Sequence, residues 1–278
     1  MKSFFKENNV EFYSIIPLSR CKVLKKYLLE KNGFDENANV ITMLFPYRSD
    51  AVIENLSVYA SVKDYHYYIT DFAKRLEEYV KSKHPLSLFK VFSDHSPIDE
   101  VHAACISGLG FIGDNGLLIN EKYSSFVFLG ECITNLTPQE LGLEYAKESE
   151  VKECIHCGAC ANACPCGCIS VKGKEFSLPK SECLSAITQK KGELTENEIK
   201  LILENGSIWG CDLCQNACPF TKKGAFTPID YFKEDIITRL DLKTLEGLGD
   251  DFNKRPFAWR GYSVIERNVN LYEDSKKI

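Results

Sequence analysis

The sequence lacks several features that would place it in a common functional class. It contains no run of 18 apolar residues, so we expect no membrane-spanning helix and no membrane partner. Its first nine residues include no apolar segment of the kind that a secretory signal requires, which favours the cytoplasm. The net charge of −5 gives no sign of a dedicated polyanion-binding protein.

Nucleotide-binding motifs and repeats are also missing. No P-loop is present, and residues 108–113 (Gly-Leu-Gly-Phe-Ile-Gly) follow a predicted helix, which is the wrong context for a dinucleotide-binding turn. No internal repeat of 20–50 residues occurs. The four histidines of residues 1–150 are not at the spacings of paired metal ligands, so we interpret them as surface or hydrogen-bonding residues.

Cysteine, in contrast, is abundant, at 13 of 278 residues. Ten cysteines lie between Cys154 and Cys218, and only Cys21, Cys105 and Cys132 are scattered. A chain of this length can bury a core without disulfides, and clustered thiols in a reducing compartment usually bind metal. We expect the three scattered cysteines to pack in the core.

Up to about residue 145 the pattern alternates between helix and strand, which predicts an α/β or α+β domain. We predict a helix that Ser19 caps and that ends near Gly33, a strand over 40–45, a helix over 64–81, a strand over 88–93 and a helix over 98–107. Residues 117–119 and 126–129 are predicted to form a hairpin. Residues 144–153 have the charged composition of a linker, and residues 226–278 are predicted to be helical.

The cysteine spacing is specific. The first run is Cys154-x2-Cys157-x2-Cys160-x3-Cys164-Pro165, in which three cysteines bind one [4Fe-4S] cluster and the fourth binds the other. The second run, Cys211-x2-Cys214-x3-Cys218-Pro219, lacks one cysteine, which Cys183 can supply. We therefore predict eight ligands: Cys154, Cys157, Cys160 and Cys218 for one cluster, and Cys164, Cys183, Cys211 and Cys214 for the other.

Two zinc sites could use the same C-x2-C pairs. Zinc does not need the x3-Cys-Pro ending, which occurs twice, so we favour iron–sulfur clusters. Cys166 and Cys168 exceed the ligand count, and we expect them to fill space. Two clusters in one small module form an electron path, so the preceding 145 residues should hold an electron acceptor.

Several stretches resemble the epoxyqueuosine reductase family. They are residues 93–97 (Ser-Asp-His-Ser-Pro), 108–113 and 125–131 (Ser-Phe-Val-Phe-Leu-Gly-Glu), with 63–66 (Lys-Asp-Tyr-His) upstream of them. The cysteine block with residues 209–215 (Trp-Gly-Cys-Asp-Leu-Cys-Gln) and the segment 259–268 are similar to the same family. The resemblance covers nearly the whole chain in one order.

The resemblance implies an α+β protein of three parts. Residues 1–145 would form an α/β domain that binds cobalamin and carries the catalysis, residues 146–225 a bacterial ferredoxin-like domain with two [4Fe-4S] clusters, and residues 226–278 a short helical segment. The implied reaction reduces epoxyqueuosine to queuosine in a tRNA anticodon, with electrons passing through the clusters to cobalamin. We expect an external electron donor, such as a flavodoxin or ferredoxin system, and a monomer.

The resemblance also implies site residues. The family's proton donor corresponds to Asp94, and general acid catalysis needs a carboxyl whose pKa is raised by burial. The competing interpretation is that Asp94 caps the following helix. Asp99 and Glu100 are expected to lie inside that helix and face water. The implied cobalamin contacts, which an ordinary structural role explains equally well for each residue, are Ser57, Asp94, Leu118, Leu129, Asp212 and Gln215.

The chain departs from the family pattern in three places. Asp114 stands where the family has a basic residue, Cys166 and Cys168 replace Thr and Ala, and we expect most of the C-terminal helical repeats to be missing. Fewer basic contacts weaken the case for a polyanionic substrate. Two alternatives therefore stay open: a corrinoid and iron–sulfur reductase of another small molecule, similar to reductive dehalogenases, and a pure electron-transfer protein.

Overall fold

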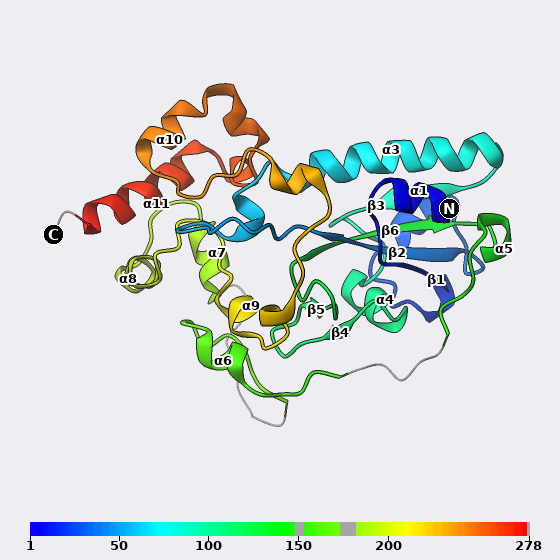
Figure 1. Cartoon of the computed structure of the whole chain (residues 1–278), viewed down its shortest axis with the longest axis horizontal. Coiled ribbons are helices and arrows are strands. Elements are labelled where there is room, and N and C mark those ends of the chain that lie inside the picture. Colours follow the sequence, from blue (N-terminus) through cyan, green and yellow to red (C-terminus); the bar gives the residue numbers. More distant parts are fainter. Residues whose placement is uncertain (148–152, 173–181, 277–278) are drawn as a thin grey trace. The chain divides into compact units, whose positions relative to one another are not determined.

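The structure, a computed structural model, describes residues 1–147, 153–172 and 182–276, so part of the predicted linker lies outside the described residues. The chain divides into two compact units (Figure 1). The first unit contains Met1–Pro46 and His66–Ile155, and the second contains Tyr47–Tyr65 and His156–Ile278. This grouping differs from the predicted division at residues 145 and 225, because Tyr47–Tyr65 belongs to the second unit.

The first unit is built on a four-stranded antiparallel sheet of order β1-β2-β6-β3. All eight residues of β2 are buried, because helices cover both faces of the sheet (Figure 1). Phe45 packs edge-on against Phe72 of α3, whereas its neighbour Leu44 joins Ala104 and Cys105 of α4. Neighbouring residues of a strand point to opposite faces. The strands are β1 (Tyr13–Pro17), β2 (Asn39–Pro46), β3 (Phe89–Phe92) and β6 (Val127–Thr134).

Five helices and a 3-10 turn complete this part of the first unit. The predicted helix over 64–81 is confirmed as α3, which buries Ile69, Phe72, Leu76 and Val80 at helical spacing. The elements are α1 (Lys2–Glu7), η1 (Leu18–Arg20), α2 (Lys26–Lys31), α3 (Tyr65–Lys83), α4 (Glu100–Ile106) and α5 (Pro138–Leu141).

Two local predictions are wrong. Ser19 lies in η1 and caps no α-helix, because α2 begins only at Lys26. The strand pairing of the predicted hairpin is wrong, although Asn120 and Ser124 pair at its turn: β5 (Leu118–Ile119) pairs with β4 (Phe111–Ile112), and β6 pairs with β2 and β3. The eight-residue β6 forms a long ladder with β2 in the middle of the sheet, which a partner of two residues cannot offer.

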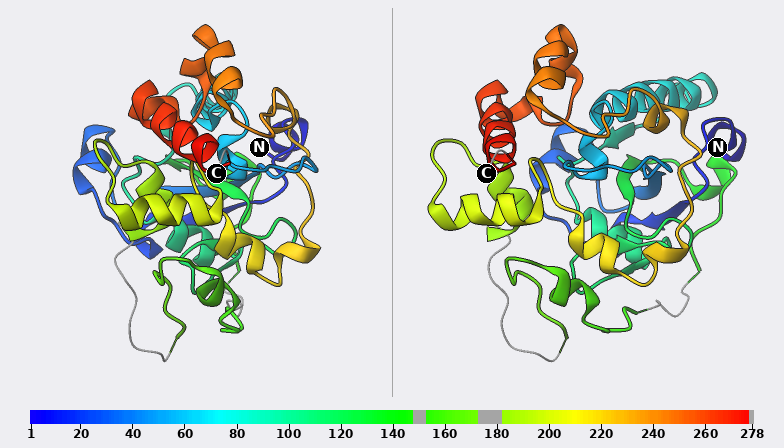
Figure 2. Two further views of the ribbon diagram at one scale, coloured as in Figure 1. Left: turned by 90° about the vertical axis from the view of Figure 1, so that its left-hand side faces the viewer. Right: turned by 60° about the vertical axis from the view of Figure 1, so that its left-hand side comes forward.

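The second unit consists of short helices and loops. The predicted C-terminal helical segment is confirmed in part, since α10 and α11 alternate with 3-10 turns, and α11 lies beside α8 (Figure 2). The elements are η2 (Val58–Ala60), α6 (Ala159–Ala163), α7 (Leu184–Thr188), α8 (Glu196–Asn205), α9 (Leu213–Ala217), η4 (Thr221–Lys223), η5 (Asp230–Lys233), α10 (Leu242–Gly247), η6 (Gly249–Lys254), η7 (Ala258–Arg260) and α11 (Tyr262–Ser275).

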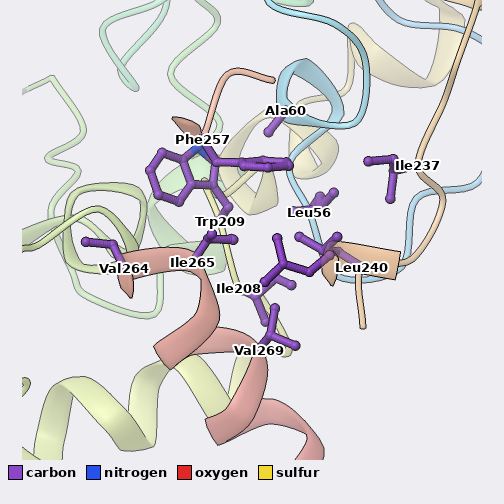
Figure 3. Close-up of a cluster of buried hydrophobic side chains, with 11 residues drawn as sticks. Leu56, Ala60, Ile208, Trp209, Ile237, Leu240, Phe257, Val264, Ile265 and Val269 are labelled. Carbon is purple, nitrogen blue, oxygen red and sulfur yellow. The ribbon is translucent and has the colours of Figure 1, made fainter. Parts of the chain in front are cut away.

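A hydrophobic cluster explains why Tyr47–Tyr65 belongs to the second unit (Figure 3). Trp209 and Phe257 are fully buried and meet edge to face, with ring centroids 6.2 Å apart. Leu56 and Ala60 from the earlier segment pack into the same cluster. Burying one large apolar side chain contributes roughly 1.5–3 kcal/mol, so this segment is held by packing. No helix in the described ranges is long and apolar enough to cross a membrane.

Candidate functional site

The cysteines of the described chain are all free thiols. Seven of the eight predicted ligands lie in the second unit, and Cys154 is grouped with the first. Within the second unit, helix α6 contains Cys160 and ends at Cys164, and it packs against α9, which contains Cys214 and ends at Cys218. The two cysteine runs are therefore neighbours in space.

Three ligands predicted for one cluster gather from three separate segments. Burial is the largest cause that raises the pKa of the Cys211 thiol to about 11, and the charges of Cys183 and Cys164 raise it further. Thiolates that repel one another in this way suit a bound cation, which lowers the pKa of each coordinating thiol. The donor set therefore fits an iron–sulfur cluster, which takes four thiolates.

Cys166 and Cys168 lie beside the same ligands and are half-buried, and Cys166 packs against the hydrophobic cluster of Leu184, Ile187 and Ile202, as expected of a space-filling residue. The Cys168 backbone N–H donates to Cys164 Sγ at 3.4 Å, and the charges of Cys164 and Cys183 raise the pKa of both extra thiols after burial does. Hydrogen bonds to ligand sulfurs tune the reduction potentials of iron–sulfur clusters. The segment of the extra cysteines is thus placed to influence a cluster.

Three of the predicted cobalamin contacts come together in the second unit. The Val58 backbone N–H donates to Asp212 Oδ2 at 2.6 Å, and Gln215 Nε2 donates to Asp212 Oδ1 at 2.8 Å. Ser57, next to Val58, donates its N–H to the Trp209 carbonyl at 2.8 Å. Burial raises the pKa of Asp212 to about 6, and the Val58 and Gln215 hydrogen bonds oppose that shift.

The Ser57 side chain is 2% exposed and sits against backbone. Its hydroxyl forms no hydrogen bond of good geometry with a described residue, although Tyr59 lies near. Gly210, at φ +72°, faces it so closely that an added Cβ would lie 2.6 Å from Ser57 Cβ. A buried hydroxyl with bonding capacity left over fits a polar group of a ligand, such as an amide arm of a corrinoid.

A pocket of about 530 Å³ adjoins this network within the second unit. Its lining includes Cys211, Asp212 and Val58, together with the charged side chains of Arg48 and Lys222. The Arg48 guanidinium donates to the Thr221 and Gly224 carbonyls, which fixes one wall. Space for a polar group therefore lies directly beside a cluster ligand.

In the first unit, Leu118 and Leu129 belong to one hydrophobic cluster, together with Leu44 and Cys105. Leu118 is 3% exposed, and Leu129 is partly buried. The structure thus brings these two predicted contacts together. An ordinary structural role as core residues also explains both side chains.

Asp94 occupies the turn between β3 and α4, with a left-handed backbone at φ 58°. Its Oδ2 lies 2.8 Å from Nε2 of His66, at the start of α3. The cap of α4 is Asp99, whose side chain accepts from the His102 N–H at 3.1 Å, so the capping interpretation of Asp94 is wrong. The Asp94 side chain is 54% exposed, so the burial expected of a general acid is not found.

Two glutamates lie behind this turn: Glu100, which the sequence analysis places in water, and Glu131, which it does not single out. Glu100 was expected to face water, but it is half-buried and its Oε1 accepts from the Asp94 N–H at 3.1 Å. Glu131, in the middle of β6, is 1% exposed. Burial raises the pKa of Glu131 well above its usual range, and the charge of Glu100 adds to this shift. The sequence signal that could have identified Glu131 is an acidic residue within an otherwise apolar strand.

A second pocket, of about 360 Å³, lies between α3 and β3 of the first unit. Its lining includes His66 and Ser93, the residues that contact or precede Asp94, and the charged residues Lys74, Glu77 and Lys90. His66 of the Asp94–His66 pair therefore lines a space whose walls are both apolar and charged. This arrangement can hold a proton where a small polar group could reach it.

Comparison with known proteins agrees with this site. Residues 153–221 match the family described as "4Fe-4S double cluster binding domain". The chain is 32% identical over 218 residues to the epoxyqueuosine reductase of Lactococcus garvieae, which covers 74% of this chain and 58% of that protein. The structure of epoxyqueuosine reductase from Streptococcus thermophilus has a TM-score of 0.76 at 25% identity, over 98% of this chain and 79% of that one.

A further crystal structure, of epoxyqueuosine reductase with an epoxyqueuosine-modified tRNA-Tyr stem loop, has a TM-score of 0.76 at 23% identity, over 98% of this chain and 79% of that one. At that identity the likeness shows the fold alone. The chain spans between 53% and 59% of the length of the first curated relatives that it matches.

The cysteine pattern and the family match define an iron–sulfur protein with a double-cluster [4Fe-4S] domain beside a mixed sheet-and-helix unit. The predicted iron–sulfur clusters and the mixed α and β fold are thereby confirmed. The chain belongs to the epoxyqueuosine reductase family.

Proposed function

We propose that this protein is an oxidoreductase that reduces epoxyqueuosine to queuosine in a tRNA anticodon, with two [4Fe-4S] clusters and cobalamin. The observation that carries the proposal is the 218-residue similarity to an epoxyqueuosine reductase, which is longer than either unit and so includes both. The tRNA stem loop bound to another member supports a tRNA substrate.

The reaction converts an epoxide to an alkene and water, which consumes two electrons and two protons. Cobalamin, when bound, supplies a reducible cobalt that can attack an electrophilic carbon. Ser57, Asp212 and Gln215 would hold its polar groups, and the eight cysteines would hold the clusters. Asp94 would give a proton to the departing oxygen, and His66 Nε2, 2.8 Å from its carboxyl, keeps that carboxyl oriented and can return a proton from solvent.

The finer arrangement belongs to the same proposal. Residues 1–145 would form the cobalamin-binding and catalytic domain, residues 146–225 the ferredoxin-like domain, and residues 226–278 the helical end. An external donor of flavodoxin or ferredoxin type would supply single electrons to the clusters, and the protein would act as a monomer.

The relatives do not favour the alternative of a corrinoid reductase for another small molecule, because the curated matches are epoxyqueuosine reductases. A pure electron carrier is also disfavoured. The double-cluster domain spans only residues 153–221. A protein that only carried electrons would therefore leave the first unit and the Asp94–His66 pair without a role.

The direct test is an anaerobic reaction of the reconstituted protein with epoxyqueuosine-containing tRNA and a chemical reductant. We expect queuosine to appear among the digested nucleosides by mass spectrometry, and only when both cobalamin and reductant are present. A protein that retains cobalamin and about eight irons per chain, yet leaves epoxyqueuosine unchanged, would reject this function.

A further inference from the structure

Two carboxyl groups meet behind the Asp94 turn, and the reaction proposed above uses neither. Glu131 of β6 is the cross-strand neighbour of Thr42 in β2, and cross-strand neighbours point to the same face of a sheet. The Thr42 hydroxyl lies 2.7 Å from the hydroxyl of Ser107, the residue that ends α4. Glu131 therefore points toward α4, whose first residue is Glu100.

Glu131 is placed as a neutral acid. Among the residues that the structure describes, no N–H or O–H donor reaches either of its carboxyl oxygens with good geometry, and its polar neighbours are the Glu100 carboxyl and the Ser96 hydroxyl. Burial of an ionised carboxylate without donors is strongly unfavourable, so the group holds its proton. Burial and the charge of Glu100 both raise the pKa of Glu131, and Ser96 opposes them in part. A neutral carboxyl has one O–H to donate, and the Glu100 carboxyl faces it.

Glu100 also contacts the backbone of the turn that contains Asp94. Its Oε1 accepts from the Asp94 N–H at 3.1 Å. A left-handed backbone is unfavourable for a residue with a side chain, and Asp94 has φ 58°. A hydrogen bond to a charged acceptor is stronger than one to a neutral acceptor, so the Glu100 contact stabilises this conformation.

We propose that Glu131 and Glu100 are positioning residues: a neutral Glu131 donates to an ionised Glu100, which fixes the backbone of Asp94 in the conformation that presents its carboxyl. The inference rests on the proposed function of Asp94, but the order of the turn can be measured without turnover. Loss of the Glu131 proton places two negative charges in contact and weakens the hold. Other titratable or charged groups in the same field are Cys21, Lys25, Asp94 and Cys132.

The test compares Glu100→Ala, Glu131→Gln and the control Glu36→Gln, which removes an exposed acid of the same unit. We expect Glu100→Ala to accelerate hydrogen exchange of the Asp94 amide and to lower the single-turnover rate about 10–100-fold, with iron content unchanged. Glu131→Gln keeps an N–H donor for Glu100 but cannot ionise. It should therefore keep the Asp94 amide protected as pH rises through the Glu131 pKa, where the protection factor of the wild type should fall. The control should match the wild type.

Wild-type exchange and wild-type rate in Glu100→Ala would overturn the role of Glu100. A protection factor of the Asp94 amide that declines with pH in Glu131→Gln as it does in the wild type would overturn the role of Glu131. If Glu100→Ala does not fold, Glu100→Gln replaces it, because its neutral amide oxygen accepts more weakly from the Asp94 N–H; wild-type exchange and wild-type rate in that folded variant would contradict the need for an ionised Glu100. Faster exchange in Glu100→Ala, with a wild-type protein that converts no epoxyqueuosine, would support positioning and reject the proposed function.

Discussion

Strand β2 of the first unit buries all eight of its residues, whereas helix α6 of the second unit, which contains the predicted cluster ligand Cys160, buries none. Helix α9, which contains the predicted ligand Cys214, buries only Gln215. The sheet is thus held by apolar packing. The cysteine segments have little such packing, and a metal-bound fold gains its free energy from ligation instead.

This difference separates two kinds of dependence on sequence. A buried strand tolerates exchange among apolar residues of similar size, because volume and pattern decide its packing. A cluster requires a thiolate at each ligand position. Substitutions should therefore act on stability in the sheet and on cofactor content in the cysteine segments.

Loss of a cluster ligand should have the largest effect. Cys183→Ala removes the thiolate that lies outside both cysteine runs, so iron should fall from about eight to about four per chain, and reduction of epoxyqueuosine should stop. Iron analysis and the electron paramagnetic resonance of the reduced protein measure this. Cys166→Ala, which removes a neighbouring thiol outside the ligand set, is the matched control. The ligand assignment is wrong if the control loses four irons and Cys183→Ala keeps them.

The next effect should come from the proposed acid. Asp94→Asn keeps the shape of the side chain but removes its proton, so the single-turnover rate should fall about 10²–10⁴-fold with full cofactor content. Asp99→Asn, five residues along the chain, is the control, since Asn caps a helix about as well as Asp and its rate should match the wild type. Equal rates for the two variants would remove Asp94 from the proton transfer.

A smaller effect should follow from filling the space at Gly210. An alanine Cβ there overlaps the Ser57 side chain, so Gly210→Ala should lower the free energy of unfolding of the second unit by roughly 1–3 kcal/mol beyond the cost of its positive φ. Gly206→Ala isolates that cost, because Gly206 also has a positive φ but its nearest neighbour, a Tyr272 carbon, would lie at 3.5 Å. Equal denaturant midpoints for both variants would contradict the close approach at Ser57.

The smallest effect concerns pH and the first unit alone. The pKa of Glu131 is raised in the folded state, so the folded chain binds more protons than the unfolded chain above the ordinary glutamate range. Stability should therefore be full at low pH and decline as pH rises through the folded pKa. Glu131→Gln should flatten this decline in denaturant titrations at several pH values. A wild type whose stability rises over that range would show that Glu131 is ionised when folded.

Local sequence determined the elements whose signals lie within one segment. The apolar spacing of α3 and the run of β2 predicted a helix and a buried strand that the structure contains. The two cysteine runs predicted a double-cluster domain, which the family match over residues 153–221 confirms. Ligand spacing survives as a signal because a cluster loop must present its sulfurs within a few residues.

The tertiary structure alone decided contacts between distant segments. It gave β6 to β2 instead of the predicted hairpin, and it joined Tyr47–Tyr65 to the second unit through Leu56 and Ala60. It also placed His66 against Asp94 and Glu131 behind Glu100. Such partners depend on which apolar faces pack together, and burial energy is non-directional, so no short pattern in the chain specifies them.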